Sequence, residues 1–232
     1  MAEIAERPVP AGDRVPVEGP VVSERPMRSD ARRNRELVLA AAEEVFSEIG
    51  VCAPIEEVGR RAGVGVGTVC RHFPTKQLLV EAVLKAMFTA LLDDARAALE
   101  RSDPGPAFRD FYFTLSDFQA RHRVLAEQMA TAVDMQITAP ELKAALHDAM
   151  SQLVERAQAA GEVRGDIGPA DVAMLFSGLA HATAVAGDVQ PALRRRCVAI
   201  MLDGLRPTEP SELPGRPLDF AQLDRLKKRA KR

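Results

Sequence analysis

Polar side chains of the types that bind nucleic acid gather between residues 66 and 76 of this chain. Thr68 can donate its hydroxyl to a phosphate or touch a thymine methyl, and Arg71 can form two parallel hydrogen bonds to a guanine edge or pair with a phosphate. His72 and Lys76 are placed to contact the DNA backbone. The residues predicted to contact DNA are Val66, Gly67, Thr68, Arg71, His72 and Lys76, together with Arg32 further upstream.

These side chains need a short, braced helix, and the stretch around them predicts a helix-turn-helix. It reads PIEEVGRRAGVGVGTVCRHFPTK from Pro54 to Lys76. Gly59 leaves room where the second helix crosses the first, and Gly63 tolerates the left-handed backbone that the turn requires. The apolar residues at the offsets needed to hold both helices are Ile55, Val58, Ala62, Val64 and Val69. The face left outward is the one that a DNA major groove would meet.

A helix on either side completes this unit. Apolar positions between residues 30 and 49 repeat at helical spacing, and such a helix would cover the open face of the helix-turn-helix. After it, Pro74 breaks the second helix and Thr75 is a good N-cap for a long helix from Lys76. The free N–H groups at that helix start attract anions, which favours a phosphate contact there.

The rest of the chain also predicts helices, so the fold class is all-α. Apolar residues make up 47% of the 232 residues and aromatic residues only 4%, which favours packed helices over a sandwich or barrel. Beyond the helix from Lys76 to Arg101, helices are predicted over 107–120, 122–136, 140–161, 169–186 and 191–205. The predicted divisions are a disordered leader (1–27), a three-helix helix-turn-helix DNA-binding domain (28–75, motif 54–73), a helical domain (76–206), and a linker with a basic tail (207–232).

Several classes of protein are excluded or disfavoured. No apolar run approaches the roughly 20 residues needed to span a membrane, and the N-terminus has no secretory pattern. Cys52, Cys70 and Cys197 show neither metal-ligand spacing nor a disulfide framework, so a reducing cytoplasm is the simplest location. No nucleotide-binding loop, nucleophile elbow or zinc-protease motif is present, so we expect no cofactor, no metal and no enzyme activity.

Charge is informative only locally. The net charge of −2 neither supports nor excludes nucleic acid, but five arginines lie between Arg25 and Arg35. This segment, which includes Arg32, could form an arm that reaches into the minor groove. It could equally be a charged leader that keeps the protein soluble. The sequence leaves both interpretations open.

The segment from about Arg32 to Ala86 resembles the tetracycline-repressor (TetR) family. The specific positions are Gly65 to Val69, the His72-Phe73 pair and Lys76; the remainder is similar only in the number, order and length of its helices. The resemblance implies a dimeric DNA-binding regulator, usually a repressor, whose helical C-terminal domain binds a small molecule and releases DNA.

Three positions depart from that family's pattern. Cys70 stands where the family mostly has a tyrosine that contacts the DNA backbone, and Gly65 and Val66 replace a more common serine and lysine. Because these changes remove phosphate contacts, we expect weaker non-specific binding rather than a different function. Oxidation of Cys70 would add bulk and polarity at this surface, but nothing in the sequence indicates a reactive thiol.

The C-terminal helices supply candidates for dimerisation and for effector binding. Apolar stripes on residues 172–186 and 191–205 would form a four-helix bundle in a dimer, or would only close the core of one protomer. The predicted dimer residues are Leu175, Leu179, Leu193, Cys197, Ile200 and Met201. The predicted effector-lining residues, flexible or aromatic and suited to a small apolar molecule, are Met87, Phe111, Phe118, Met129, Met135 and Met150.

Two other functions are considered beside a ligand-released repressor on an inverted-repeat operator. One is an architectural DNA-binding dimer without a ligand, and the other is a helical enzyme, which no catalytic motif supports. The basic tail could be disordered, pack on the helices or attract DNA non-specifically. The operator, the effector, the regulated genes and the choice between repression and activation do not follow from the sequence.

Overall fold

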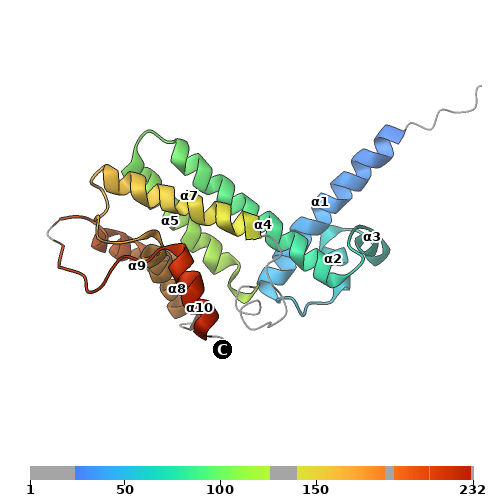
Figure 1. Ribbon diagram of the computed structural model, residues 1–232. Helices are drawn as coiled ribbons and strands as arrows, with labels where there is room; N and C mark the ends of the chain where they lie inside the picture. Colours follow the sequence, from blue (N-terminus) through green and yellow to red (C-terminus); the bar gives the residue numbers. More distant parts are fainter. Residues whose placement is uncertain (1–23, 126–139, 186–190, 209, 231–232) are drawn as a thin grey trace, which may run out of the picture.

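The computed structural model describes residues 24–125, 140–185, 191–208 and 210–230, and every regular element within these ranges is an α-helix, as the sequence predicts. The helices are α1 (Glu24–Glu48), α2 (Ile55–Ala62), α3 (Val66–His72), α4 (Lys76–Glu100), α5 (Pro104–Arg121), α7 (Pro140–Ala159), α8 (Pro169–Val185), α9 (Pro191–Gly204) and α10 (Phe220–Ala230). Figure 1 shows α1, α2 and α3 at one end of the molecule and α5, α7, α8 and α9 at the other, with α4 running between them. In the described residues no helix is long and apolar enough to cross a membrane.

The first helix begins earlier than predicted. The sequence indicated a start near Asp30, after a disordered leader of residues 1–27, but α1 already begins at Glu24. Pro26 lies in its first turn, where the missing N–H would have had no intrahelical partner, and the arginines and glutamates that follow are good helix formers. The rest of that leader, residues 1–23, lies outside the described residues.

The later helices follow the prediction to within a few residues. α5 begins at Pro104 rather than at residue 107, since proline suits the first helical position. α7 ends at Ala159, and Gly161 follows with a φ of 73°, a left-handed conformation that favours glycine. Most of the predicted helix over residues 122–136 lies outside the described residues. The part that the structure describes is helical at residues 123–125.

The N-terminal helices enclose a core of their own. Buried members of this N-terminal cluster include Val38, Val45, Phe46, Val58, Val69, Phe73, Leu79 and Val83. Gly59 allows the close crossing of α2 and α3, because a Cβ there would lie 3.0 Å from the carbonyl oxygen of Val64. Gly63 ends α2 in the left-handed region with a φ of 68°. Both glycine predictions are therefore confirmed.

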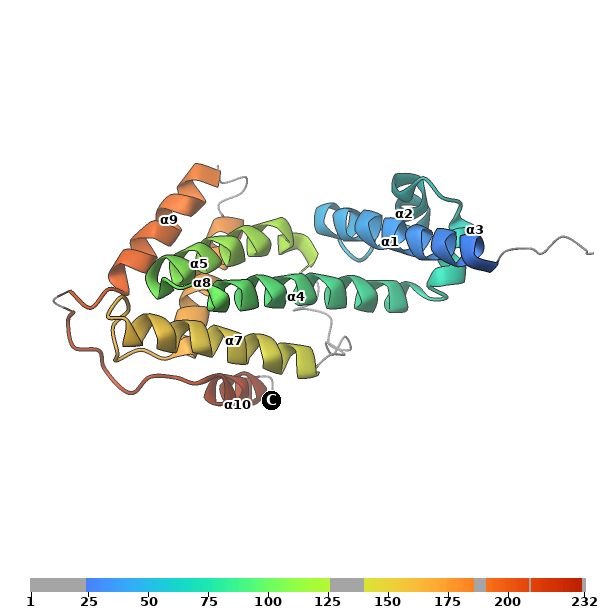
Figure 2. The same cartoon turned by 90° about the horizontal axis from the view of Figure 1, so that it is seen from above.

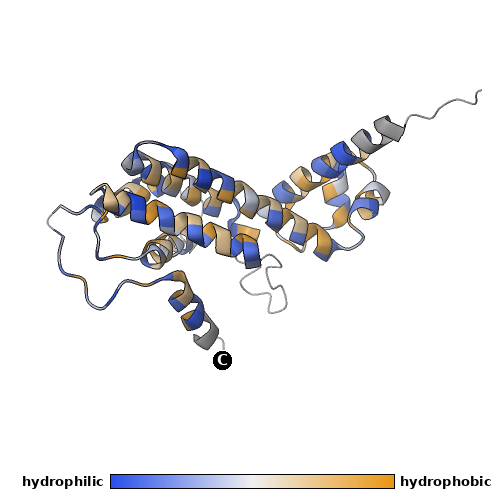
Figure 3. Cartoon of the chain, turned by 45° about the horizontal axis from the view of Figure 1, so that its top comes forward, coloured by the Kyte–Doolittle hydropathy of each residue, from blue (hydrophilic) through white to orange (hydrophobic). Residues whose placement is uncertain are grey.

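A second core lies among α4, α5, α7, α8 and α9. Its larger buried members are Leu91, Leu92, Phe108, Phe111, Tyr112, Leu115, Met150, Leu153, Phe176 and Leu202. Figure 2 shows α4, α5 and α7 running beside one another with α8 and α9 crossing them, and Figure 3 shows apolar faces on these helices. We refer to this set as the C-terminal cluster.

Helix α4 contributes to both cores. Val80, Val83 and Met87 belong to the N-terminal cluster, whereas Leu91 and Leu92, about one turn later, belong to the C-terminal cluster. Thr75 caps the helix start as predicted, with its hydroxyl accepting from the Leu78 N–H at 3.2 Å. A change in the tilt of α4 therefore necessarily affects both ends of the molecule.

The tail packs on the C-terminal helices, which is one of the alternatives that the sequence left open. The Phe220 ring stacks on His147 of α7 with centroids 3.9 Å apart, and Leu223 is buried. Lys143 pairs with Asp224 at 2.9 Å, and the Leu218 N–H donates to the Asp171 carboxylate of α8 at 3.2 Å. Helix α10 is therefore an ordered part of the fold.

Candidate nucleic-acid interface

Helix α3 is held by its inner face, so its other face is left toward solvent. Val69 is completely buried at the middle of the helix and Phe73 is buried directly after it. Gly65 has an extended backbone at the N-cap, with φ −68° and ψ 149°, and its carbonyl accepts from the Thr68 and Val69 N–H groups. In Figure 1 this helix lies at the end of the molecule remote from α8 and α9.

None of the seven residues predicted to contact DNA is buried. Gly67, Arg71 and Arg32 are exposed, while Val66, Thr68, His72 and Lys76 are half-buried. Six of the seven come from α3 and the first residue of α4, and Arg32 comes from α1. The fold therefore brings the five predicted contact residues of α3 together on one outer surface.

The charges at this surface are available for phosphate. Within the described residues, Arg71 and Lys76 make no ion pair, whereas Arg32 pairs with exposed Glu36 at 3.1 Å. An exposed pair of this kind contributes little to stability and is easily exchanged for another partner. Lys76 lies in the first turn of α4, where the helix dipole favours an anion.

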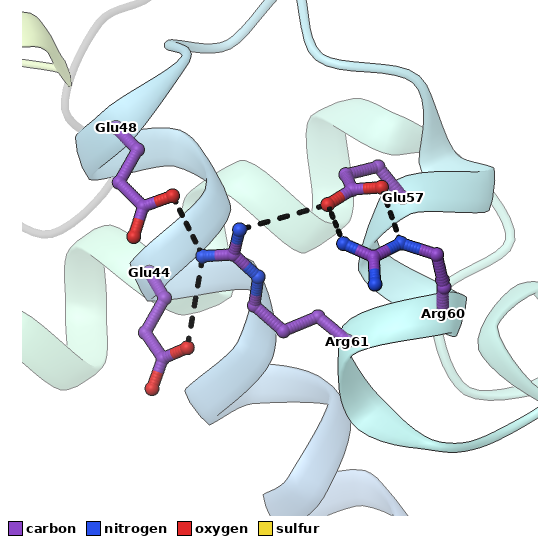
Figure 4. A network of polar contacts seen from close by, with 5 residues as sticks. All are labelled: Glu44, Glu48, Glu57, Arg60 and Arg61. Atoms are coloured by element: carbon purple, nitrogen blue, oxygen red, sulfur yellow. Dashed lines mark hydrogen bonds and ion pairs between the residues drawn. The ribbon is translucent and has the colours of Figure 1, made fainter.

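A network of charged side chains fixes α2 against α1 (Figure 4). Arg61 of α2 lies 2.8 Å from Glu48 and 3.8 Å from Glu44 of α1, and its other terminal nitrogen lies 3.6 Å from Glu57. Arg60 donates to Glu57 within α2 at 2.5 and 2.8 Å. The hydrogen bond from Arg60 is the main reason that the pKa of Glu57 is lowered. These two arginines therefore position the motif and are already engaged by carboxylates.

A second brace holds the end of α3. The Arg35 guanidinium of α1 lies over the Phe73 ring, 5.1 Å from its centroid. Local sequence patterns do not indicate this role, since Arg35 is only one of a run of arginines there. Pairs so far apart in the chain cannot be found from helical periodicity.

His122 joins the C-terminal helices to the DNA-binding unit. This residue directly follows the last residue of α5 and is only 3% exposed. Its Nδ1 atom lies 2.8 Å from the Ser47 hydroxyl of α1. Nε2 lies 3.6 Å from the Glu43 carboxylate. Burial, and secondarily the charge of Arg121, lowers the pKa of His122 to about 4. The imidazole is therefore neutral near pH 7. No local pattern in the sequence indicates its contact with Ser47, which lies 75 residues away.

The predicted effector-lining residues do not form one group. Phe111 and Met150 are buried in the C-terminal cluster, whereas Met87 is buried in the N-terminal cluster. Phe118 is half-buried against both clusters, and its ring lies 6.3 Å from that of Phe88. Met129 and Met135 lie outside the described residues.

The predicted dimer residues lie on the outer side of α8 and α9. Leu175, Leu193 and Ile200 are 48%, 51% and 59% exposed, and Leu179, Cys197 and Met201 are half-buried. The α8 residue next to Leu175, Met174, is also 48% exposed. These two helices thus carry a concentration of exposed apolar side chains.

A three-helix unit that presents one short helix outward, with threonine, arginine and histidine on it, defines a helix-turn-helix protein. The family model described as "Bacterial regulatory proteins, tetR family" matches residues 38–83. A second model, "Transcriptional regulator SbtR-like, C-terminal domain", matches residues 103–207.

Individual proteins give the same result. The crystal structure of a TetR transcription regulatory protein from Mycobacterium vanbaalenii is 36% identical, with a TM-score of 0.62, and the match covers 78% of this chain and 99% of that one. The HTH-type transcriptional regulator UidR of Escherichia coli is 27% identical over 67% of this chain and 82% of its own length. The HTH-type transcriptional regulator SAR0097 of Staphylococcus aureus is 34% identical over 64 residues, which cover 27% of this chain and 34% of its own length.

This chain belongs to the TetR family of transcriptional regulators. It is a DNA-binding regulator and not an enzyme. The family resemblance found in the helix-turn-helix sequence is confirmed.

Proposed function

We propose that this regulator is a repressor that binds an inverted-repeat operator as a homodimer and releases it when a small apolar effector binds. The observation that carries the proposal is the outward face of α3, where Thr68 and Arg71 stand on a helix anchored by buried Val69. In this proposal Arg71 reads a base, while Lys76 and His72 hold the backbone.

The exposed apolar surface of α8 and α9 supports the dimer. A single helix-turn-helix reads too few bases for useful specificity, so such units act in pairs one helical turn of DNA apart. Leu175, Leu193 and Ile200 are each about half exposed, which is costly in an isolated protomer. Two copies of α8 and α9 form a four-helix bundle in which these side chains are covered.

Two connections support regulation by an effector. Helix α4 packs in both clusters, and His122 links the end of α5 to Ser47 of α1. A molecule that displaced α5 or α4 would change the position of the helix-turn-helix relative to the α8 and α9 surface. A shift of a few ångströms against the ~34 Å groove repeat is enough to prevent both units from docking together.

The first experiment measures operator binding and stoichiometry. The DNA flanking the coding region is searched for an inverted repeat, and the purified full chain is titrated onto that duplex and onto one with a single half-site. We expect two protomers on the full operator and much weaker binding to the half-site. Equal affinity for both duplexes would contradict the dimeric reading mode.

A variant pair tests the dimer surface. Ile200→Glu places a charge on the exposed face of α9 and should give a monomer in sedimentation with a large loss of operator affinity. Leu213→Glu is the control, since Leu213 is also exposed, at 40%, but lies outside α8 and α9. If both variants remain dimers, another surface makes the pairing.

Thermal-shift screening with apolar compounds then separates a ligand-responsive repressor from an architectural binder, because only a true effector site gives ligand-dependent stabilisation.

A further inference from the structure

Tyr112 is the only tyrosine in the chain, and its ring lies inside the C-terminal cluster. It belongs to α5, and its ring centroid lies 4.7 Å from that of Phe108 and 5.4 Å from that of Phe111 in the same helix. Phe176 of α8 is closest, at 4.5 Å. The side chain is 0% exposed. A group of aromatic rings of this kind suits an apolar molecule, and the tyrosine hydroxyl adds a polar atom to it.

That hydroxyl has no hydrogen-bond partner among the described residues. A buried hydroxyl is normally paired, because leaving it unpaired costs stability that a phenylalanine of the same shape would not. Burial raises the pKa of Tyr112, so the group keeps its proton and remains a donor. The other orphaned buried polar atom, Nε of Arg194, belongs to a guanidinium that already pairs with Asp117 at 2.7 Å.

We propose that Tyr112 is the polar anchor of the effector site, donating one hydrogen bond to an ether or carbonyl oxygen of a small, uncharged, otherwise apolar ring compound. The inference rests on the proposed function, whose effector it assigns to a chemical class. One donor calls for one acceptor, and the surrounding phenylalanines carry no counter-charge that would pair with a buried ion. The molecule enters between α5 and α8 by separating the rings of Tyr112 and Phe176.

The position of Tyr112 connects this site to both ends of the regulator. Phe176, whose ring lies against that of Tyr112, belongs to α8 and directly follows Leu175 of the proposed dimer surface. Toward the other end, α5 runs about 15 Å from Tyr112 to His122, at 1.5 Å per residue, where the ring meets Ser47 of α1. Insertion of an effector against Tyr112 therefore moves a helix that directly contacts the DNA-binding unit.

A matched pair of probes tests the hydrogen bond. Tetrahydropyran and cyclohexane are six-membered rings of similar size, and only the first has an oxygen acceptor. Dissociation constants for both are measured with the full-length wild type and with Tyr112→Phe. We expect the dissociation constant for cyclohexane divided by that for tetrahydropyran to fall about threefold to tenfold in the variant. This fall corresponds to the net contribution of one hydrogen bond. Thr114→Val is the control, since it removes an exposed hydroxyl from the same helix and should leave the ratio unchanged.

A second readout needs no variant. The chain has one tyrosine and no tryptophan, so its tyrosine absorption band reports on Tyr112 alone. Neither probe absorbs in that region, and donation to tetrahydropyran should shift the band to longer wavelength, while cyclohexane should not. An unchanged ratio in Tyr112→Phe, or a band that does not respond to tetrahydropyran, overturns the proposal.

The apo protein and the DNA complex keep this result separate from the proposed function. Tyr112→Phe should melt at the same temperature as the wild type or higher, because no hydrogen bond is lost; a marked loss of stability would reveal a partner for the hydroxyl and count against the site. Operator affinity of the effector-free variant should match the wild type. If the wild type binds no operator, the proposed function fails, whereas the probe ratio still decides the role of Tyr112.

Discussion

The two hydrophobic clusters of this regulator are built from different side chains. The fully buried residues of the N-terminal cluster are mainly short and branched, such as Val38, Val58 and Val69, and charged pairs brace its helices from outside. The C-terminal cluster instead contains adjoining aromatic rings from α5 and α8 and an unpaired hydroxyl.

We relate this difference to two tasks, DNA binding by the N-terminal helices and the proposed effector binding by the C-terminal helices. Valine has few side-chain conformations, so a core of valines holds α3 in one geometry, as docking into a groove of fixed shape requires. Aromatic side chains present large apolar surfaces, which suit the binding of a small apolar molecule. The DNA-binding end is thus preorganised, while the other end offers these surfaces to the proposed effector.

The largest effect is expected from opening the C-terminal cluster. Phe176→Ala removes a completely buried ring and should lower the free energy of unfolding by about 3–5 kcal/mol. Denaturant titration measures this, and apolar compounds such as benzene should restore part of the loss by filling the cavity. Leu213→Ala, at a 40% exposed position outside α8 and α9, is the control and should cost much less. Similar losses for the two variants would mean that burial of the Phe176 ring does not account for the effect.

A second prediction concerns base reading by α3. Arg71→Ala should weaken operator binding by about 1–3 kcal/mol and relax the preference at one position in each half-site. A panel of operators with single base changes measures both effects. Arg96→Ala, an exposed arginine on α4 outside the proposed surface, should leave affinity unchanged. Equal losses on every duplex would show that Arg71 contacts the backbone instead.

The third prediction tests the junction between the two ends. Because the pKa of His122 is lowered to about 4 in the folded state, the unfolded state binds more protons below about pH 6.5, and the stability associated with the neutral ring is lost as pH falls. Unfolding free energies measured at pH 7 and pH 5 should differ by about 1–2 kcal/mol more in the wild type than in His122→Gln.

Thr114→Val is the control for this pH experiment, since it changes an exposed, uncharged residue of α5 outside the junction. It should leave the pH dependence of stability as in the wild type. The polar and charged groups that face His122 include Ser47, Glu43 and Arg121, so Ser47→Ala should also weaken the junction. A pH dependence in His122→Gln equal to that of the wild type would show that other groups produce the effect.

The helix-turn-helix could be predicted from the sequence because its requirements are local. Gly59, Gly63 and Thr75 each act on residues within about one turn of helix or one loop, so their roles appear in the order of residues alone. Helical periodicity likewise predicted most of the later helices. It could not predict α10, whose packing depends on a distant partner, His147.

The remaining site contacts could not be predicted because they join segments far apart in the chain. Ser47 and His122 are 75 residues apart, and Tyr112 meets Phe176 from another helix. A stripe of apolar residues predicts that its members are buried, but not which helix they pack against. The candidate effector residues illustrate this, since Met87 and Met150 fit the same pattern and lie in different clusters.

The smallest effect is expected at Lys76, and it sharpens the contrast with Arg71. Lys76→Ala removes one phosphate contact and should weaken binding to operator and to unrelated DNA alike, by on the order of 1 kcal/mol at physiological salt. A plot of log affinity against log salt concentration should lose about one unit of slope. Lys85→Ala, an exposed lysine further along α4, is the control. A salt dependence that does not change, or a loss confined to the operator, would mean that the start of α4 does not bind phosphate and that α3 alone makes the backbone contacts.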